Sequence, residues 1–195
     1  MGHIAARRHL AGTPGLSYLM ELRHYSKEKI TFDRDRTYRD HGARGGKPDG
    51  FWVSVAGPYD WEWWCREEDF GLHHLAVVHR VTLAEDATIL RITCGEELDA
   101  FHNQWAVETR ISRSLGQLGE PYPKRYWEID WAAVAEQWEG IIIAPYLWSH
   151  RFAGPFWFYG IDCASGCIWN PRAVASVEVI SDPPLIPLDI SSENP

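Results

Sequence analysis

Short apolar segments of strand length dominate this sequence, and helical segments do not separate them at regular intervals. Segments rich in β-branched and aromatic residues predict strands over the second half of 16–25 and over 51–55, 75–83, 88–93, 141–144, 156–161, 167–169 and 173–180. Helical spacing of apolar residues is found over 59–70, 96–110 and 131–138. Without regular strand–helix alternation, the pattern favours an α+β domain with a mainly antiparallel or split mixed sheet and two to four helices.

Local signals refine this interpretation at several points. The strands predicted at 75–83 and 88–93 have only a short polar connection between them, so we expect them to pair antiparallel. Asp60 and Asp130 each precede a helical segment and are expected to cap it, and Gly140 is expected to stop the second of these helices.

The length of 195 residues fits one domain. Residues 1–14 end in turn-forming residues and are interpreted as a flexible leader, and residues 181–195 as a proline-rich tail. The domain is therefore expected over 15–180. Within it, glycine and proline mark 33–50 and 112–124 as loops.

Composition narrows the functional classes. A formal net charge of −8 argues against a general nucleic-acid binder, although Arg34 to Lys47 is locally basic and is either a solvated loop or a phosphate-contacting one. There is no apolar run long enough to cross a bilayer and no good signal peptide, so a cytoplasmic protein without membrane partners is expected. Cys163 and Cys167 have a spacing that invites a metal, but no second ligand pair accompanies them. Buried thiols and no metal are therefore predicted.

Eleven tryptophans are an unusual number for a chain of this length. Tryptophan buries a large area and carries an N–H that requires a partner, so such clusters usually build core. The same side chains can stack on a planar ring such as a nucleobase or nicotinamide. Composition alone does not decide whether these tryptophans build the core or stack on a ligand ring.

Three segments combine polar side chains with expected strands. Arg23-His24-Tyr25-Ser26 ends the first strand, where arginine can hold a phosphate and histidine can donate to a ribose hydroxyl. In 47–54 a glycine enters an aromatic strand that carries Ser54. This arrangement lets a ligand approach the backbone, or is simply a turn into a strand.

The third segment is 156–171, where Asp162 and Ser165 interrupt aromatic residues. A buried polar side chain costs free energy unless it has a partner or a role. The alternative is a tight hairpin whose turn is capped by Asp162 or Ser165. A nucleophilic role for Cys163 or Cys167 would require a depressed thiol pKa.

Taken together, the segments 23–26, 50–54 and 165–171 followed by 173–180 resemble ADP-ribosyltransferase-like domains, which bind NAD. In that family a first strand carries His or Arg, a second an aromatic residue and Ser, and a late strand a catalytic Glu that stabilises an oxocarbenium-like state. This sequence has Ser165 where the family has that Glu, and the nearest acid is Asp162.

The resemblance implies an ADP-ribosyltransferase or NAD glycohydrolase with NAD as substrate. It would bind a small nucleotide ligand and act on an unidentified acceptor macromolecule, protein or nucleic acid. The implied catalytic residues are His24, which would orient the ribose, Ser54, Asp162 and Ser165. Those implied for NAD binding are Arg23, Tyr25, Ser26, Lys47, Gly50, Trp52, Trp61, Trp64 and Tyr159.

Two other classes remain open from the sequence. One is a non-enzymatic binding or inhibitor domain that docks a partner through an exposed tryptophan patch, to which Trp61 and Trp64 would belong. The other is an enzyme acting on a nucleic-acid base or nucleoside, with tryptophans as the stacking platform and the basic loop on phosphate.

Overall fold

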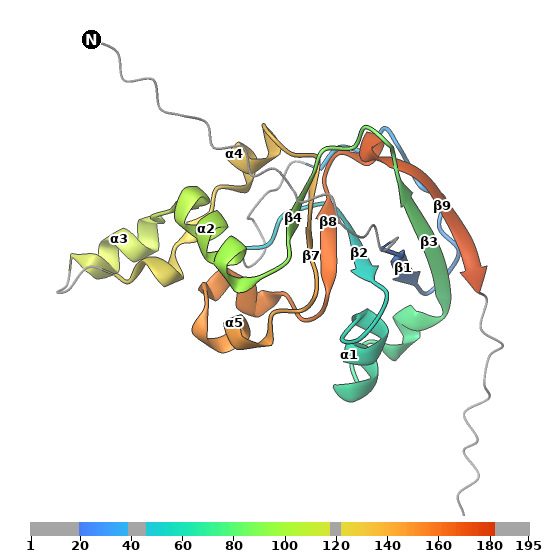
Figure 1. The fold of residues 1–195 in the computed structure, drawn as a ribbon, viewed down its shortest axis with the longest axis horizontal. Helices are drawn as coiled ribbons and strands as arrows, with labels where there is room; N and C mark the ends of the chain where they lie inside the picture. The colour runs from blue at the N-terminus through green and yellow to red at the C-terminus, as the bar shows by residue number, and fades with distance from the viewer. Residues whose placement is uncertain (1–19, 39–45, 118–121, 182–195) are drawn as a thin grey trace, which may run out of the picture.

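A curved seven-stranded mixed sheet organises the fold in the computed structural model, which describes residues 20–38, 46–117 and 122–181 (Figure 1). The strand order is β4-β7-β8-β2-β1-β3-β9; β4 and β7 are parallel, and the other neighbours are antiparallel. The bounds are β1 Leu22–Ser26, β2 Phe51–Val55, β3 Val77–Leu83, β4 Ile89–Ile92, β7 Gly140–Ile143, β8 Ser165–Ile168 and β9 Val174–Ser181. The chain is thus a single α+β domain, as predicted.

Five α-helices lie in the described part of the chain, more than the two to four predicted. They are α1 Trp61–Glu67, α2 Gly95–Trp105, α3 Arg110–Gly116, α4 Trp131–Ala135 and α5 Trp148–Ala153. Short 3-10 helices are η1 Leu72–Leu75, η2 Lys124–Tyr126, η3 Phe156–Gly160 and η4 Pro171–Ala173, and β5 Ala106–Val107 pairs with β6 Glu128–Ile129. The two predicted caps are confirmed, since Asp60 accepts from the Trp63 N–H and Asp130 from the Ala133 N–H.

Several predicted elements are wrong. Residues 75–83 and 88–93 do not pair with each other: β3 lies between β1 and β9, while β4 crosses to pair with β7. The strand predicted at 156–161 is the 3-10 helix η3. There Trp157 and Phe158 are both buried, whereas Phe156 and Tyr159, three residues apart, are both exposed. Residues 110–116, predicted as helix end and loop, form α3, and Gly140 begins β7.

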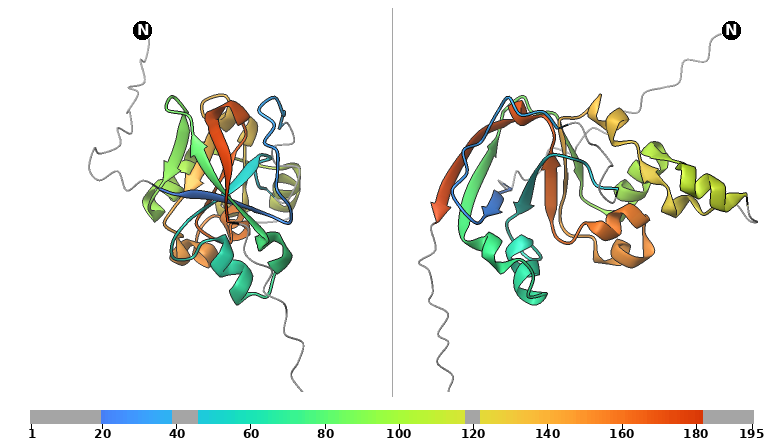
Figure 2. Two further views of the ribbon diagram at one scale, coloured as in Figure 1. Left: turned by 90° about the vertical axis from the view of Figure 1, so that its right-hand side faces the viewer. Right: turned by 180° about the vertical axis from the view of Figure 1, so that it is seen from behind.

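The sheet has two halves that meet at β1 and β2. We call β4, β7, β8 and β2 the inner half and β1, β3 and β9 the outer half (Figure 2). Two residue pairs, Leu22–Val55 and Arg23–Ser54, join the halves. Beyond these two pairs, the Trp52 carbonyl accepts a hydrogen bond from the His24 ring rather than from a backbone N–H of β1. The strands therefore separate at His24.

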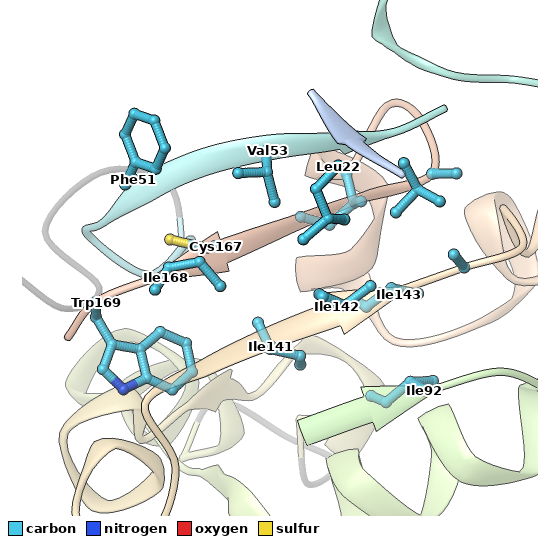
Figure 3. Packing of buried hydrophobic residues seen from close by; sticks show 14 of the residues in the cluster. Leu22, Phe51, Val53, Ile92, Ile141, Ile142, Ile143, Cys167, Ile168 and Trp169 are labelled. Carbon is cyan, nitrogen blue, oxygen red and sulfur yellow. The ribbon is translucent and has the colours of Figure 1, made fainter. Parts of the chain in front are cut away.

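The hydrophobic core is concentrated on the inner half. Every residue of β7 and β8 is buried, which is the pattern of strands covered on both faces, and their apolar side chains lie beside those of the neighbouring strand β2 in the core (Figure 3). Three tryptophans belong to this core: Trp131, Trp157 and Trp169, whose rings contact one another at centroid distances of 5.5 and 6.2 Å. For these three, the core interpretation of the tryptophan clusters is confirmed.

The leader and tail predicted for the chain ends lie largely outside the described residues. Ser181, placed in the tail, is the last residue of β9, which confirms the strand predicted at 173–180 and forms one edge of the sheet. No helix in the described ranges is both long and apolar enough to cross a bilayer.

Candidate functional site

A pocket of about 490 Å³ lies where β1 and β2 separate. Its size falls within the range of small-molecule sites. Residues from both halves of the sheet, α1, η1 and the segment 160–165 line it. The lining residues are Arg23, His24, Tyr25, Lys47, Trp52, Val53, Ser54, Trp61, Phe70, His74, Gly160, Ile161, Asp162, Cys163 and Ser165. We refer to it as the cleft.

The cleft brings together most of the residues singled out from the sequence. Its walls include His24, Ser54, Asp162 and Ser165, together with Arg23, Tyr25, Lys47, Trp52 and Trp61. Four residues that were predicted with them do not line the cleft: Ser26, Gly50, Trp64 and Tyr159.

Each of the outlying residues has another environment. The Ser26 hydroxyl donates to the Glu28 carbonyl, and Tyr159 is exposed beside Phe156. Trp64 packs under the guanidinium of Arg151 at 4.7 Å. A side chain at Gly50 would come within 2.5 Å of the Cys167 sulfur, so this glycine makes room for β8 rather than for a ligand.

Strand register aligns three polar residues across the cleft. Arg23 is paired with Ser54, and Ser54 with Ser165. Residues directly opposite each other in a sheet point to the same face. The register therefore forms a polar row across β1, β2 and β8, and the two serines come from strands that are far apart in the sequence.

The two serine hydroxyls are already engaged within the protein. Ser54 Oγ accepts from the Trp61 N–H at 2.8 Å and so helps to fix the first turn of α1. Ser165 Oγ donates to the Cys163 carbonyl at 3.1 Å, which stabilises the turn into β8. The predicted hairpin is wrong, because the segment before this turn is the 3-10 helix η3 and β8 pairs with β2 and β7.

His24 is held in a defined tautomer. Its Nδ1 lies 2.9 Å from the Trp52 carbonyl oxygen, which can only accept, so Nδ1 carries the proton. Burial lowers the pKa of His24 below its usual value, and the nearby His79 lowers it further, against the opposing effect of the Trp52 carbonyl. The ring also stacks on Phe51 at 4.4 Å. In the neutral ring Nε2 is an acceptor, whereas the sequence interpretation had His24 as a donor.

Tyr25 lines the cleft, and its hydroxyl is buried. No hydrogen-bond partner with full geometry meets that hydroxyl among the described residues, and burial raises its pKa to about 12. The Arg23 guanidinium lies close enough to offset part of this increase. At neutral pH Tyr25 is therefore a protonated phenol.

Asp162 is the one carboxylate among the residues that line the cleft, and two cations hold it. Arg151 Nη2 lies 3.4 Å from Oδ1, and Lys47 Nζ lies 3.9 Å from Oδ2. Arg151 is itself fixed, because its Nη1 donates to the Tyr146 hydroxyl at 2.6 Å. That hydroxyl in turn donates to the Ile161 carbonyl at 2.8 Å.

Lys47 connects this ionic cluster to the aromatic wall. Its ammonium lies 5.8 Å from the centre of the Trp52 ring, and its aliphatic stem crosses Gly160, where a Cβ would come within 2.8 Å of it. The cleft thus combines flat rings with positive charge.

The cysteines are not placed as nucleophiles. Burial raises the pKa of Cys163 to about 12 and that of Cys167 well above its usual value. Both thiols are therefore protonated at neutral pH and poor nucleophiles. Within the described ranges, no group of three His, Cys, Asp or Glu side chains could hold a metal.

Sequence reasoning missed Arg151, Tyr146, Phe70 and His74. The first two form the support of Asp162, and the last two line the cleft. The only sequence signal for Arg151 is a charged residue within an aromatic segment, and α5 was not predicted. Of the basic segment Arg34 to Lys47, only Lys47 lines the cleft; residues 39–45 lie outside the described ranges.

The chain matches no protein-family model, no curated protein and no solved structure. The function proposed below therefore rests on the geometry of the cleft.

Proposed function

We propose that the cleft binds NAD and that the protein breaks the bond between nicotinamide and ribose, as an ADP-ribosyltransferase or NAD glycohydrolase. The observation that carries this proposal is the convergence of His24, Ser54, Asp162 and Ser165 in one pocket at the point where the two halves of the sheet separate. Three separate sequence segments supply these residues.

The walls of the cleft suit the parts of a dinucleotide. The rings of Trp52 and Trp61 offer stacking surfaces for nicotinamide, which in NAD is a cationic ring. Arg23 and Lys47 supply positive charge for the pyrophosphate. Glu21 orients the Arg23 guanidinium through a contact of 2.8 Å between Nε and Oε1.

Asp162 is assigned the electrostatic role in bond breaking. When the glycosidic bond breaks, its electron pair leaves with neutral nicotinamide and positive charge develops on the ribose. A carboxylate close to that charge stabilises the transition state. Water or an acceptor hydroxyl then forms the new bond to the ribose carbon and releases its proton to bulk water. Arg151 keeps the carboxylate in place but also offsets part of its charge.

His24 and the serines are assigned to positioning. Neutral His24 accepts a hydrogen bond from a ribose hydroxyl at Nε2, since Nδ1 is engaged. Ser54 fixes α1, and with it Trp61, through the Trp61 N–H. Ser165 retains acceptor capacity while its proton is donated to Cys163.

The test measures NAD binding by calorimetry and nicotinamide release by chromatography. We expect wild-type protein to do both and Asp162→Asn to retain binding while losing most of the release. Asp99→Asn is the matched control, because it also removes a carboxylate that contacts a basic side chain, here His150 at 3.5 Å, outside the cleft. Absence of both NAD binding and nicotinamide release, with protein, DNA and RNA acceptors supplied, would refute the proposal.

A second candidate function is partner binding, supported by exposed aromatic residues at a different place from the one predicted. Trp61 and Trp64 are half-buried, whereas Phe152 is 69% exposed and Phe156 57% exposed. Exposed apolar patches of this kind mark interaction sites. Replacing both phenylalanines by serine is expected to abolish capture of a binding partner without unfolding the domain; unchanged capture would remove this candidate.

A further inference from the structure

A second pocket, of about 330 Å³, concentrates positive charge on an acidic protein. Arg34, Arg36 and Arg172 line it together with a single carboxylate, that of Asp35, although the chain as a whole has a formal net charge of −8. The pocket lies between the segment 34–38 and the turn that follows β8. We call it the arginine pocket.

The arginine pocket is separate from the cleft. The two pockets share no lining residue. Ser165, which lines the cleft, begins β8, whereas Trp169, which lines the arginine pocket, directly follows the last residue of β8. At the strand rise of about 3.3 Å per residue, roughly 13 Å separates these two positions. A ligand of the arginine pocket is therefore a new feature beyond the proposed NAD chemistry.

Two of the three arginine side chains, those of Arg34 and Arg36, have contacts within the arginine pocket. Arg34 Nη2 donates to the main-chain carbonyl of Arg172 at 3.2 Å, and the main-chain N–H of Arg172 donates to Asn170 Oδ1 at 3.1 Å, which fixes the turn that carries the Arg172 side chain. The Arg36 guanidinium stacks over the Tyr38 ring at 5.0 Å. Ordering long side chains before a ligand arrives reduces the entropy lost on binding.

Among the described residues that line the pocket, three are arginines and Asp35 is the one acid, while Asp33 and Asp49 lie near enough to Tyr38 to act on it electrostatically. Arg172 Nη2 lies 3.7 Å from Asp35 Oδ1, but both side chains are highly exposed, at 77% and 89%, so this ion pair contributes little. Three guanidiniums beside one lining carboxylate leave positive charge in the pocket that an anion can neutralise. Guanidinium groups match the oxygens of a phosphate in geometry as well as in charge.

We propose that the arginine pocket binds the phosphate groups of a small phosphorylated ligand. A volume near the lower end of the range of ligand sites suits a phosphate or pyrophosphate group better than a large cofactor. The sequence left open whether the basic segment is a solvated or a phosphate-contacting loop, and the convergence of Arg34 and Arg36 with Arg172 favours phosphate contact.

The test is a calorimetric titration of the full chain with inorganic pyrophosphate at low salt. We expect wild-type protein to bind, and the double variant Arg36→Gln, Arg172→Gln to bind at least about ten-fold more weakly, because it loses two charge-assisted contacts. The double variant Arg66→Gln, Arg113→Gln removes two exposed cations that line neither pocket and is expected to change the affinity less than about two-fold, which controls for the same change in net charge. Lys47→Gln removes a cation from the cleft and so shows whether pyrophosphate binds there instead.

Three results would overturn the inference. The first is no binding of pyrophosphate by the wild type at millimolar concentration. The second is loss of binding in Lys47→Gln but not in the double variant of Arg36 and Arg172, which would place the anion in the cleft. The third is tighter binding of a single-stranded oligonucleotide without terminal phosphates than of pyrophosphate, lost in that double variant. Circular dichroism confirms that each variant is folded.

Discussion

The two halves of the sheet differ in how they are buried. In the inner half, β7 and β8 have no exposed or half-buried residue, and Ile141, Ile142 and Ile143 are all covered. In the outer half, β3 alternates between buried and more exposed residues and carries the exposed Arg80, as a strand with one open face does. The centre of the inner half, β7 and β8, is thus embedded in the core, whereas its edge strand β4 is partly exposed, and the outer half is a layer against solvent.

The cleft lies at the boundary of these two environments. The inner half supplies Ser54 and Ser165 from well-packed strands, and the outer half supplies His24 from a strand joined to β2 by two residue pairs. A site built across such a boundary combines rigid positioning with room for a ligand. Buried strands that pair along their whole length would leave no such opening.

The contrast between the halves is tested most strongly by truncating one side chain in each. Ile142→Ala is expected to lower the free energy of unfolding by about 2–5 kcal/mol, because it leaves a cavity in β7. Val179→Ala, on the outer edge strand β9, is expected to cost less than about 1 kcal/mol, since that side chain is 41% exposed. Urea unfolding measures both values, and similar losses would show that the two halves are equally packed.

A smaller effect is expected for the arginine that supports Asp162. Arg151→Ala removes hydrogen bonds to Tyr146 and Asp162 from a side chain only 9% exposed, and is expected to cost about 2 kcal/mol. Arg66→Ala loses an ion pair with Glu62, but its side chain is 65% exposed, so about 0.5 kcal/mol or less is expected. Thermal unfolding of both variants measures these losses of stability, and equal shifts in the melting temperature would contradict the supporting role of Arg151.

The smallest expected effect is a change in pH dependence at the boundary of the halves. The pKa of His24 is lower in the folded state than its ordinary value of 6.5, so the unfolded chain binds more protons. Its contribution to stability is therefore fully present above pH 6.5 and decreases as the pH falls below that value toward the pKa of the folded state.

The variant His24→Asn keeps a donor for the Trp52 carbonyl but cannot titrate. We expect its stability to fall less between pH 7 and pH 5 than that of the wild type, as measured by denaturant midpoints. The residual slope comes in part from His102, whose pKa is also lowered by burial. An unchanged slope would show that His24 titrates alike in both states.

Local features were predictable because they depend on neighbouring residues. Asp60 and Asp130 cap helices through contacts to N–H groups three positions away, and β2 follows from consecutive aromatic and β-branched residues. The error at 156–161 has the same origin, since aromatic residues in sequence do not distinguish a strand from a 3-10 helix until Trp157 and Phe158 find their places in the core.

The sequence by itself determined the fold class, the strand at 51–55 and most of the residues that line the cleft. Only the tertiary structure decided that Ser54 faces Ser165, that Asp162 is held by Arg151, and that Arg34 and Arg36 meet Arg172. The physical reason is that strand order and register depend on which apolar faces are buried against each other by segments distant in the chain. No local pattern encodes those contacts.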